Sequence, residues 1–158
     1  MKRTKIVNGQ VITPYRILSD GVVEIQEGKI DYVGERGSGL PCEEEIDARG
    51  NFVSPGFVDI HTHGGGGHDF MDGTPEAILG AAELHARYGT TSIVPTTLTC
   101  PNEELKDLMA AFRIAKPANQ RGAKLLGLHL EGRTLRADRP GVRMCAISGS
   151  LTGKSTWK

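Results

Sequence analysis

The chain has 158 residues, of which 38% are hydrophobic and 24% charged, a composition typical of a soluble globular protein with a sizeable core. Lysine plus arginine and aspartate plus glutamate both number 19, so the chain lacks the excess positive charge with which proteins bind nucleic acid. No apolar run is long enough to cross a membrane or to act as a secretion signal. We therefore expect a cytoplasmic protein with no nucleic-acid or membrane partner.

The first third of the chain has the pattern of β-strands. Apolar and polar residues alternate over residues 5–8, 22–26 and 29–33, as they do in strands that bury one face. Asn-Gly, Asp-Gly and Glu-Gly pairs separate these segments and favour tight turns. We therefore expect residues 5–54 to form an antiparallel β-meander.

From residue 52 onward, strands alternate with helices. Residues 57–60, 91–94 and 125–130 are almost continuously apolar, which is typical of buried parallel strands. Two amphipathic segments lie between them. Strands that alternate with helices predict βαβ units and a parallel sheet, which is an α/β fold.

Both helices have recognisable ends. Thr74 is a suitable N-cap and Pro75 suits the first helical position; the expected apolar face holds Ile78, Ala82, His85 and Tyr88, before Gly89. The second helix is expected to stop at Pro117, with an apolar face of Leu105, Leu108, Met109 and Phe112. Beyond Gly132 the sequence has neither a strand period nor a helix period, and no element is predicted there.

A pair of histidines follows the first of the apolar strands. In an extended backbone, residues two apart point to the same side, so the imidazoles of His61 and His63 should converge. At the carboxyl end of a barrel strand they would project into the mouth, where such enzymes keep their chemistry. Imidazole pairs suit zinc, iron and similar divalent ions. Asp59, two residues earlier, would orient a ligand or lie in the barrel interior.

Residues 55–64, Pro-Gly-Phe-Val-Asp-Ile-His-Thr-His-Gly, resemble the opening strand motif of the amidohydrolase superfamily, which carries a metal-binding His-x-His at the end of its first barrel strand. Residues 61–74, together with residues 89–92 and 95–97, indicate one family within this superfamily. They resemble the N-acetylglucosamine-6-phosphate deacetylase family.

The resemblance implies a fold and a division into domains. It implies a partial TIM (β/α) barrel, comprising the first three βα units, preceded by part of a small β-sandwich domain. Residues 1–54 would be the amino-terminal part of that small domain and residues 55–132 the first barrel units. Residues 133–158 are left as an unassigned, non-native tail.

The resemblance also implies a site. Glu131 in Gly-Leu-His-Leu-Glu-Gly matches the family's metal-binding glutamate, and His61 and His63 would flank the same divalent ion or hold a second one. His129 is expected to be packed or hydrogen-bonded instead. The implied reaction converts N-acetylglucosamine 6-phosphate, a small amino-sugar phosphate, to glucosamine 6-phosphate and acetate. The intact family member would be a homo-oligomer.

Other functions remain open at this point. The His-x-His pair also suits a dihydroorotase-like or other cyclic-amide hydrolase, and a non-catalytic fragment is the alternative outside the enzymes. No residue of the chain is assigned as the catalytic acid or base, because the family's aspartate would lie beyond Lys158. We therefore expect the chain as written to lack deacetylase activity.

The likeness to the family stops at Gly132. The family continues with proline and an aromatic pair, where this chain has Arg133-Thr134-Leu135. Codon degeneracy permits a frame shifted by one base near codon 132 to read Glu-Gly-Pro-Tyr-Phe and, farther on, Val-Arg-Tyr-Ile-Arg, which resembles the family's continuation. We therefore favour a shifted reading frame over a divergent tail.

Overall fold

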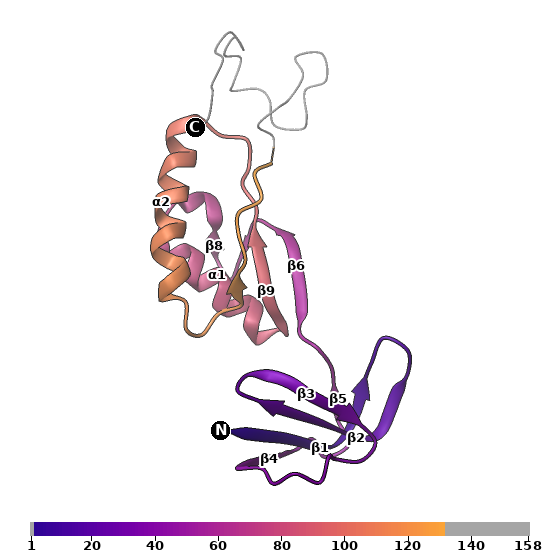
Figure 1. Ribbon diagram of the computed structural model, residues 1–158. Coiled ribbons are helices and arrows are strands. Elements are labelled where there is room, and N and C mark those ends of the chain that lie inside the picture. Colours follow the sequence, from indigo (N-terminus) through magenta and orange to yellow (C-terminus); the bar gives the residue numbers. More distant parts are fainter. Residues whose placement is uncertain (1, 132–158) are drawn as a thin grey trace. The chain divides into compact units, whose positions relative to one another are not determined.

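A computed structural model describes residues 2–131 of the chain. The predictions for residues 133–158 lie outside this range. The chain forms two compact units, one of residues 1–55 and one that begins at Gly56, and both are drawn in Figure 1. No helix in the described range combines the length and the apolar character needed to span a membrane.

The first unit is a single five-stranded sheet in the order β3-β2-β1-β4, with β5 also paired to β1. Its strands are β1 (Arg3–Ile12), β2 (Ile17–Gln26), β3 (Lys29–Gly34), β4 (Glu44–Asp47) and β5 (Phe52–Val53). The predicted meander is confirmed for β1, β2 and β3, which pair antiparallel. It is wrong for β4 and β5, which both run parallel to β1. A tight turn gives antiparallel neighbours, whereas the longer connection over residues 35–43 lets the chain cross to the far side of β1.

A buried ionic cluster holds that connection on the sheet. The Glu24 side chain on β2 is fully buried, and it accepts hydrogen bonds from the backbone nitrogen of Ser38 at 2.7 Å and from its hydroxyl at 2.6 Å. The Arg3 guanidinium donates to the same carboxylate at 2.8 Å, and the Lys5 ammonium lies 3.7 Å away. The carboxylate therefore joins β1, β2 and the connection to one another. The apolar core of this unit is small, with Val11, Leu18 and Val23 buried.

The second unit alternates strands and helices around a parallel sheet in the order β10-β9-β6. Its elements are β6 (Phe57–Thr62), β7 (Gly64–Gly65), β8 (His68–Asp69), a short 3₁₀ helix η1 (Phe70–Asp72), α1 (Pro75–Arg87), β9 (Thr90–Pro95), α2 (Asn102–Ala118) and β10 (Lys124–Leu125). The predicted α/β alternation is confirmed. Within the described residues the sheet is open, and the third strand has no helix after it, so the assignment of these strands to a partial TIM barrel of three βα units stays a prediction.

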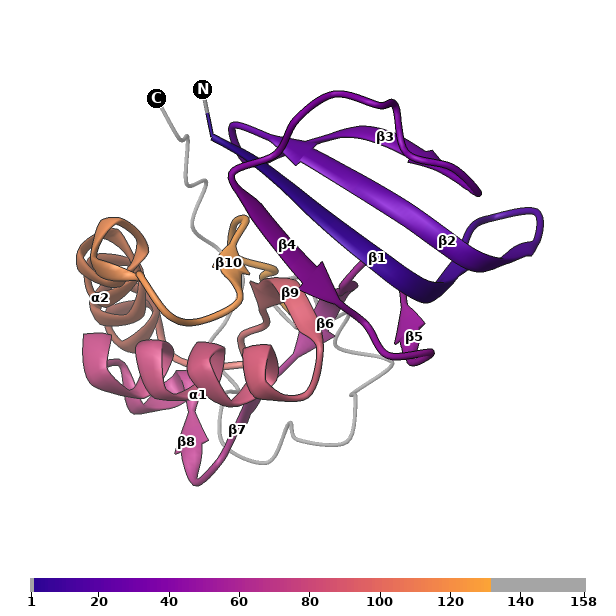
Figure 2. The same cartoon turned by 90° about the horizontal axis from the view of Figure 1, so that it is seen from below.

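Both helices pack on one face of this sheet, as the two views in Figures 1 and 2 show. The core between helices and sheet contains large side chains from every layer. Phe70, Ile78, Ile93, Leu108 and Leu125 are all at most 2% exposed. The stripe predicted for α2 is buried at Leu105, Leu108 and Phe112, and the helix continues one residue past the predicted stop, to Ala118. Proline is tolerated there because only the last turn loses a bond.

Helix α1 begins as its sequence predicts. The Thr74 hydroxyl accepts a hydrogen bond from the backbone nitrogen of Ala77 at 3.2 Å, and Pro75 occupies the first turn. The prediction that Tyr88 belongs to the apolar face of this helix is wrong, because Tyr88 is 79% exposed. The helix ends at Arg87, so Tyr88 leaves the face on which Ile78 and Ala82 are buried.

Replacing Thr74 by alanine should destabilise the second unit by about 1 kcal/mol, because the Ala77 N–H loses its cap. Chemical denaturation monitored by far-ultraviolet circular dichroism measures this change. The Thr74→Ser variant keeps the acceptor and serves as the control. An equal loss in both variants would show that the hydroxyl cap is not responsible.

The third strand is shorter than predicted. A strand was expected over residues 125–130, whereas β10 spans only Lys124–Leu125, followed by an isolated parallel bridge between Thr96 and His129. Pro95 explains the gap, since it has no N–H to donate to the facing carbonyl of Leu126. The Lys116 ammonium on α2 donates to that carbonyl instead, at 2.9 Å.

Candidate metal centre

The sheet brings three predicted residues to one edge. His61 lies in β6 and His63 follows it directly. Glu131 lies two residues beyond His129, which bridges in parallel to Thr96 next to the end of β9. Parallel strands direct their carboxyl ends to the same edge, and the side chains of His61, His63 and Glu131 meet there.

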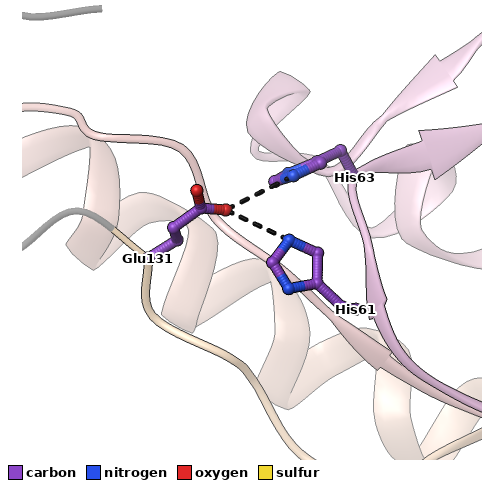
Figure 3. Close-up of side chains that lie close together, drawn as sticks. All are labelled: His61, His63 and Glu131. Carbon is purple, nitrogen blue, oxygen red and sulfur yellow. Dashed lines mark ion pairs between the residues drawn. The ribbon is translucent and has the colours of Figure 1, made fainter. Parts of the chain in front are cut away.

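The contacts between them are short. The Glu131 Oε2 atom lies 3.3 Å from His61 Nε2 and 3.4 Å from His63 Nε2, and Figure 3 shows both imidazoles facing this carboxylate. The three potential ligand atoms all lie within 4.8 Å of one another. The side chains are 38–49% exposed, so solutes can reach the group from solution.

A backbone hydrogen bond orients the imidazole of His63. Its Nδ1 lies 3.2 Å from the Thr96 carbonyl oxygen. A carbonyl only accepts, so Nδ1 carries a hydrogen, and in the neutral ring the lone pair is on Nε2, which faces Glu131. A lone pair that faces a carboxylate oxygen calls for a positive charge between the two atoms. A metal ion or a proton supplies that charge, and this donor set is one that divalent metals take.

Two neighbouring side chains have other roles. The Asp59 carboxylate accepts a hydrogen bond from the backbone nitrogen of His61 at 3.0 Å, so it orients the main chain of His61. His129 is hydrogen-bonded, as expected, with Nδ1 at 3.4 Å from the Thr96 hydroxyl. Its ring also meets the ring of His61 edge-on at 4.9 Å between centroids.

The glycine run after His63 forms a tight hairpin. Gly64 and Gly65 pair with the two residues of β8, and the turn residues Gly66 and Gly67 have φ values of 64° and 84°, a region that favours glycine. A Cβ atom on Gly65 would lie 2.8 Å from the Leu84 side chain of α1. The close backbone approach that these glycines allow is therefore an approach to β8 and to α1.

Two residues near the candidate centre make contacts that were not predicted from the sequence. His85 was placed only on the apolar face of α1, yet its Nε2 lies 3.1 Å from the Gly64 carbonyl and 3.3 Å from the Thr62 hydroxyl. Thr97 was noted only as part of a motif, yet its hydroxyl accepts a hydrogen bond from the backbone nitrogen of Glu131 at 3.0 Å. No local sequence signal marks either contact, because each joins segments that are far apart in the chain.

The chain matches no protein-family model, but individual proteins resemble it clearly. It is 34% identical over 137 residues to the N-acetylglucosamine-6-phosphate deacetylase of Bacillus subtilis (strain 168), a match that covers 84% of this chain and 35% of the relative. It is 36% identical over 118 residues to the N-acetylgalactosamine-6-phosphate deacetylase of Escherichia coli O157:H7, covering 73% of this chain and 27% of the relative.

Solved structures agree with these matches. The N-acetylglucosamine-6-phosphate deacetylase of Pasteurella multocida superposes with a TM-score of 0.75 at 30% identity, covering 89% of this chain and 37% of that one. A variant of the Mycobacterium smegmatis enzyme in complex with N-acetyl-D-glucosamine-6-phosphate superposes with a TM-score of 0.68 at 28% identity, covering 84% and 33%.

The shared fold makes this chain a relative of the amidohydrolases. More particularly, it is a relative of the N-acetylglucosamine-6-phosphate deacetylases, and it spans about a third of their length.

Proposed function

We propose that residues 56–131 form part of the metal site of an enzyme that hydrolyses the acetamide of N-acetylglucosamine 6-phosphate, giving glucosamine 6-phosphate and acetate. The observation that carries the proposal is the meeting of two imidazole nitrogens with one carboxylate oxygen at 3.3 and 3.4 Å. The likeness to deacetylases of this class supports the choice of substrate.

The residues present fit a divalent ion such as zinc or iron. His61 Nε2, His63 Nε2 and the Glu131 carboxylate would hold it, since borderline divalent metals take nitrogen and oxygen ligands of this kind. A metal ion bound at such a site polarises an amide carbonyl and makes water a stronger nucleophile at neutral pH.

Neighbouring groups of the chain orient the histidines of this site. The Thr96 carbonyl holds the hydrogen of His63 on Nδ1 and leaves Nε2 available. The Asp59 carboxylate fixes the backbone from which His61 projects. Glu131 contributes the negative charge that offsets a divalent cation. Each of the two histidines is therefore oriented by a second group, as metal-binding residues commonly are.

The epimeric sugar phosphate is a second candidate substrate. The chain is as similar to an N-acetylgalactosamine-6-phosphate deacetylase, at 36% identity, as it is to the relative from Bacillus subtilis, at 34%. The two substrates share the acetamide and the phosphate and differ in the orientation of one hydroxyl group. The three residues of the candidate centre would serve either substrate equally.

A segment graft tests the proposed function. Residues 56–131 replace the matching segment of the Bacillus subtilis relative, and acetate release is measured with both sugar phosphates. We expect the graft to be a metal-dependent deacetylase. Its activity should fall by more than about 100-fold when it carries Glu131→Gln, because losing a metal ligand lowers activity more than losing a group that only orients a ligand. A folded graft that works equally well with Glu131→Gln would contradict the proposal.

A further inference from the structure

We propose that Thr97 is a positioning residue of the candidate metal centre: its hydroxyl fixes the main chain of Glu131 and thereby the direction of the Glu131 carboxylate. This inference rests on the proposed function, because it concerns the same site. It assigns a role to a side chain that would not itself contact the metal.

The hydrogen bonds around Thr97 continue the sheet beyond its last regular pair. The His129 backbone nitrogen donates to the Pro95 carbonyl at 2.9 Å, and the Thr97 backbone nitrogen donates to the His129 carbonyl at 2.9 Å. In a regular parallel ladder the next acceptor would be the Thr97 carbonyl. The backbone nitrogen of Glu131 donates to the Thr97 hydroxyl instead, at 3.0 Å. The side chain thus extends the ladder by one bond.

Burial of Thr97 stabilises its hydrogen bond with the Glu131 backbone nitrogen. Thr97 is 1% exposed, whereas the Glu131 side chain that depends on it is 46% exposed. A buried donor or acceptor that loses its partner is costly, so a buried hydroxyl favours a single arrangement. The exposed carboxylate is therefore held by a group that solvent does not reach.

Adjacent residues serve the two sides of the centre. The Thr96 carbonyl accepts from His63 Nδ1 at 3.2 Å, and the Thr97 hydroxyl accepts from the Glu131 backbone at 3.0 Å. The first contact uses main chain and tolerates many side chains at position 96. The second uses a side chain, so it requires threonine or serine at position 97.

Zinc titration of the full chain tests the inference. We expect Thr97→Val, which keeps the shape and removes the hydroxyl, to lower zinc affinity by about 10-fold, the range found when a group behind a metal ligand is lost. Thr97→Ser restores the acceptor and should bind zinc within about 2-fold of the wild type. In a Glu131→Gln background, Thr97→Val should have no further effect, because Thr97 acts through Glu131.

The possible results separate the inference from the proposed function. If Glu131→Gln weakens binding and Thr97→Val does not, the inference is wrong and the metal site stands. If Glu131→Gln leaves binding unchanged, the proposed function fails, and the inference fails with it. If Thr97→Val does not fold, Thr97→Ser decides. The inference is supported if Thr97→Ser binds zinc as tightly as the wild type and its Glu131 amide is protected from hydrogen exchange. It is overturned if Thr97→Ser loses about 10-fold or more in zinc affinity.

Discussion

Replacing Glu131 by glutamine is expected to weaken zinc binding to the full chain by about 100-fold or more, because the change removes the only negative charge of the three-residue group and leaves a poor neutral ligand. Both imidazoles face the same carboxylate oxygen, at 3.3 and 3.4 Å, so its loss affects the whole group. Competition with a chromophoric chelator at neutral pH measures the affinity. His63→Asn should reduce it as well.

Glu45→Gln is the matched control for this experiment. Glu45 is an exposed residue of β4 in the first unit, and the substitution changes net charge by the same amount. Its zinc affinity should equal that of the wild type. Equal affinities in Glu131→Gln and Glu45→Gln would show that zinc binds elsewhere or nonspecifically.

Replacing Glu24 by glutamine is expected to destabilise the first unit by on the order of 2 kcal/mol, because it removes one of the two carboxylates that pair with the buried Arg3 guanidinium, the other being Asp31. The new amide nitrogen would also face groups that only donate, including the Ser38 backbone nitrogen now 2.7 Å from the carboxylate. Amide hydrogen exchange of β1 and β2 as a function of urea measures the change within this unit.

Glu44→Gln provides the comparison for Glu24. Glu44 also pairs with a cation, Lys2 at 2.9 Å, but its side chain is 45% exposed, and exposed ion pairs contribute little to stability. The exchange rates of β1 and β2 should therefore change little. Similar destabilisation in Glu24→Gln and Glu44→Gln would show that the buried ion pair stabilises the unit no more than the exposed one does.

The same carboxylate predicts a dependence on pH. Burial alone raises the pKa of Glu24, but hydrogen bonds from Ser38, the charge of Lys5 and a hydrogen bond from Arg3 outweigh it and hold the pKa below its ordinary value of 4.5. Its stabilising contribution is therefore complete above pH 4.5 and is lost as the pH falls through the folded-state pKa. Between pH 4.5 and the lower folded-state pKa, the wild type should therefore lose stability more steeply than Glu24→Gln. Parallel stability curves would contradict this cause.

Local signals predicted the helices well. Thr74 and Pro75 marked the start of α1 because a cap depends only on the next few residues. The buried stripe of α2 followed from the helical period. The strands were harder to predict, since their partners depend on distant segments. No alternating segment was identified at β4, and its parallel pairing with β1 depends on the connection before it.

The candidate site was predicted unevenly for the same reason. The convergence of His61 and His63 follows from the period of a strand, whereas the approach of Glu131 depends on how three strands align. Thr97 and His85 contact residues 34 and 21–23 positions away in the chain, so no local pattern could predict them. The gap after β10 was visible in principle, because Pro95 cannot donate a backbone hydrogen bond.

The central claim is that His61, His63 and Glu131 together bind one divalent ion, and X-ray absorption at the zinc edge tests it most directly. On the full chain loaded with one equivalent of zinc, the account predicts imidazole nitrogens at about 2.0–2.1 Å and a carboxylate oxygen at about 2.0–2.2 Å, with the imidazole signal diminished in His63→Asn. A spectrum dominated by sulfur at about 2.3 Å, or one with no imidazole contribution, would contradict it.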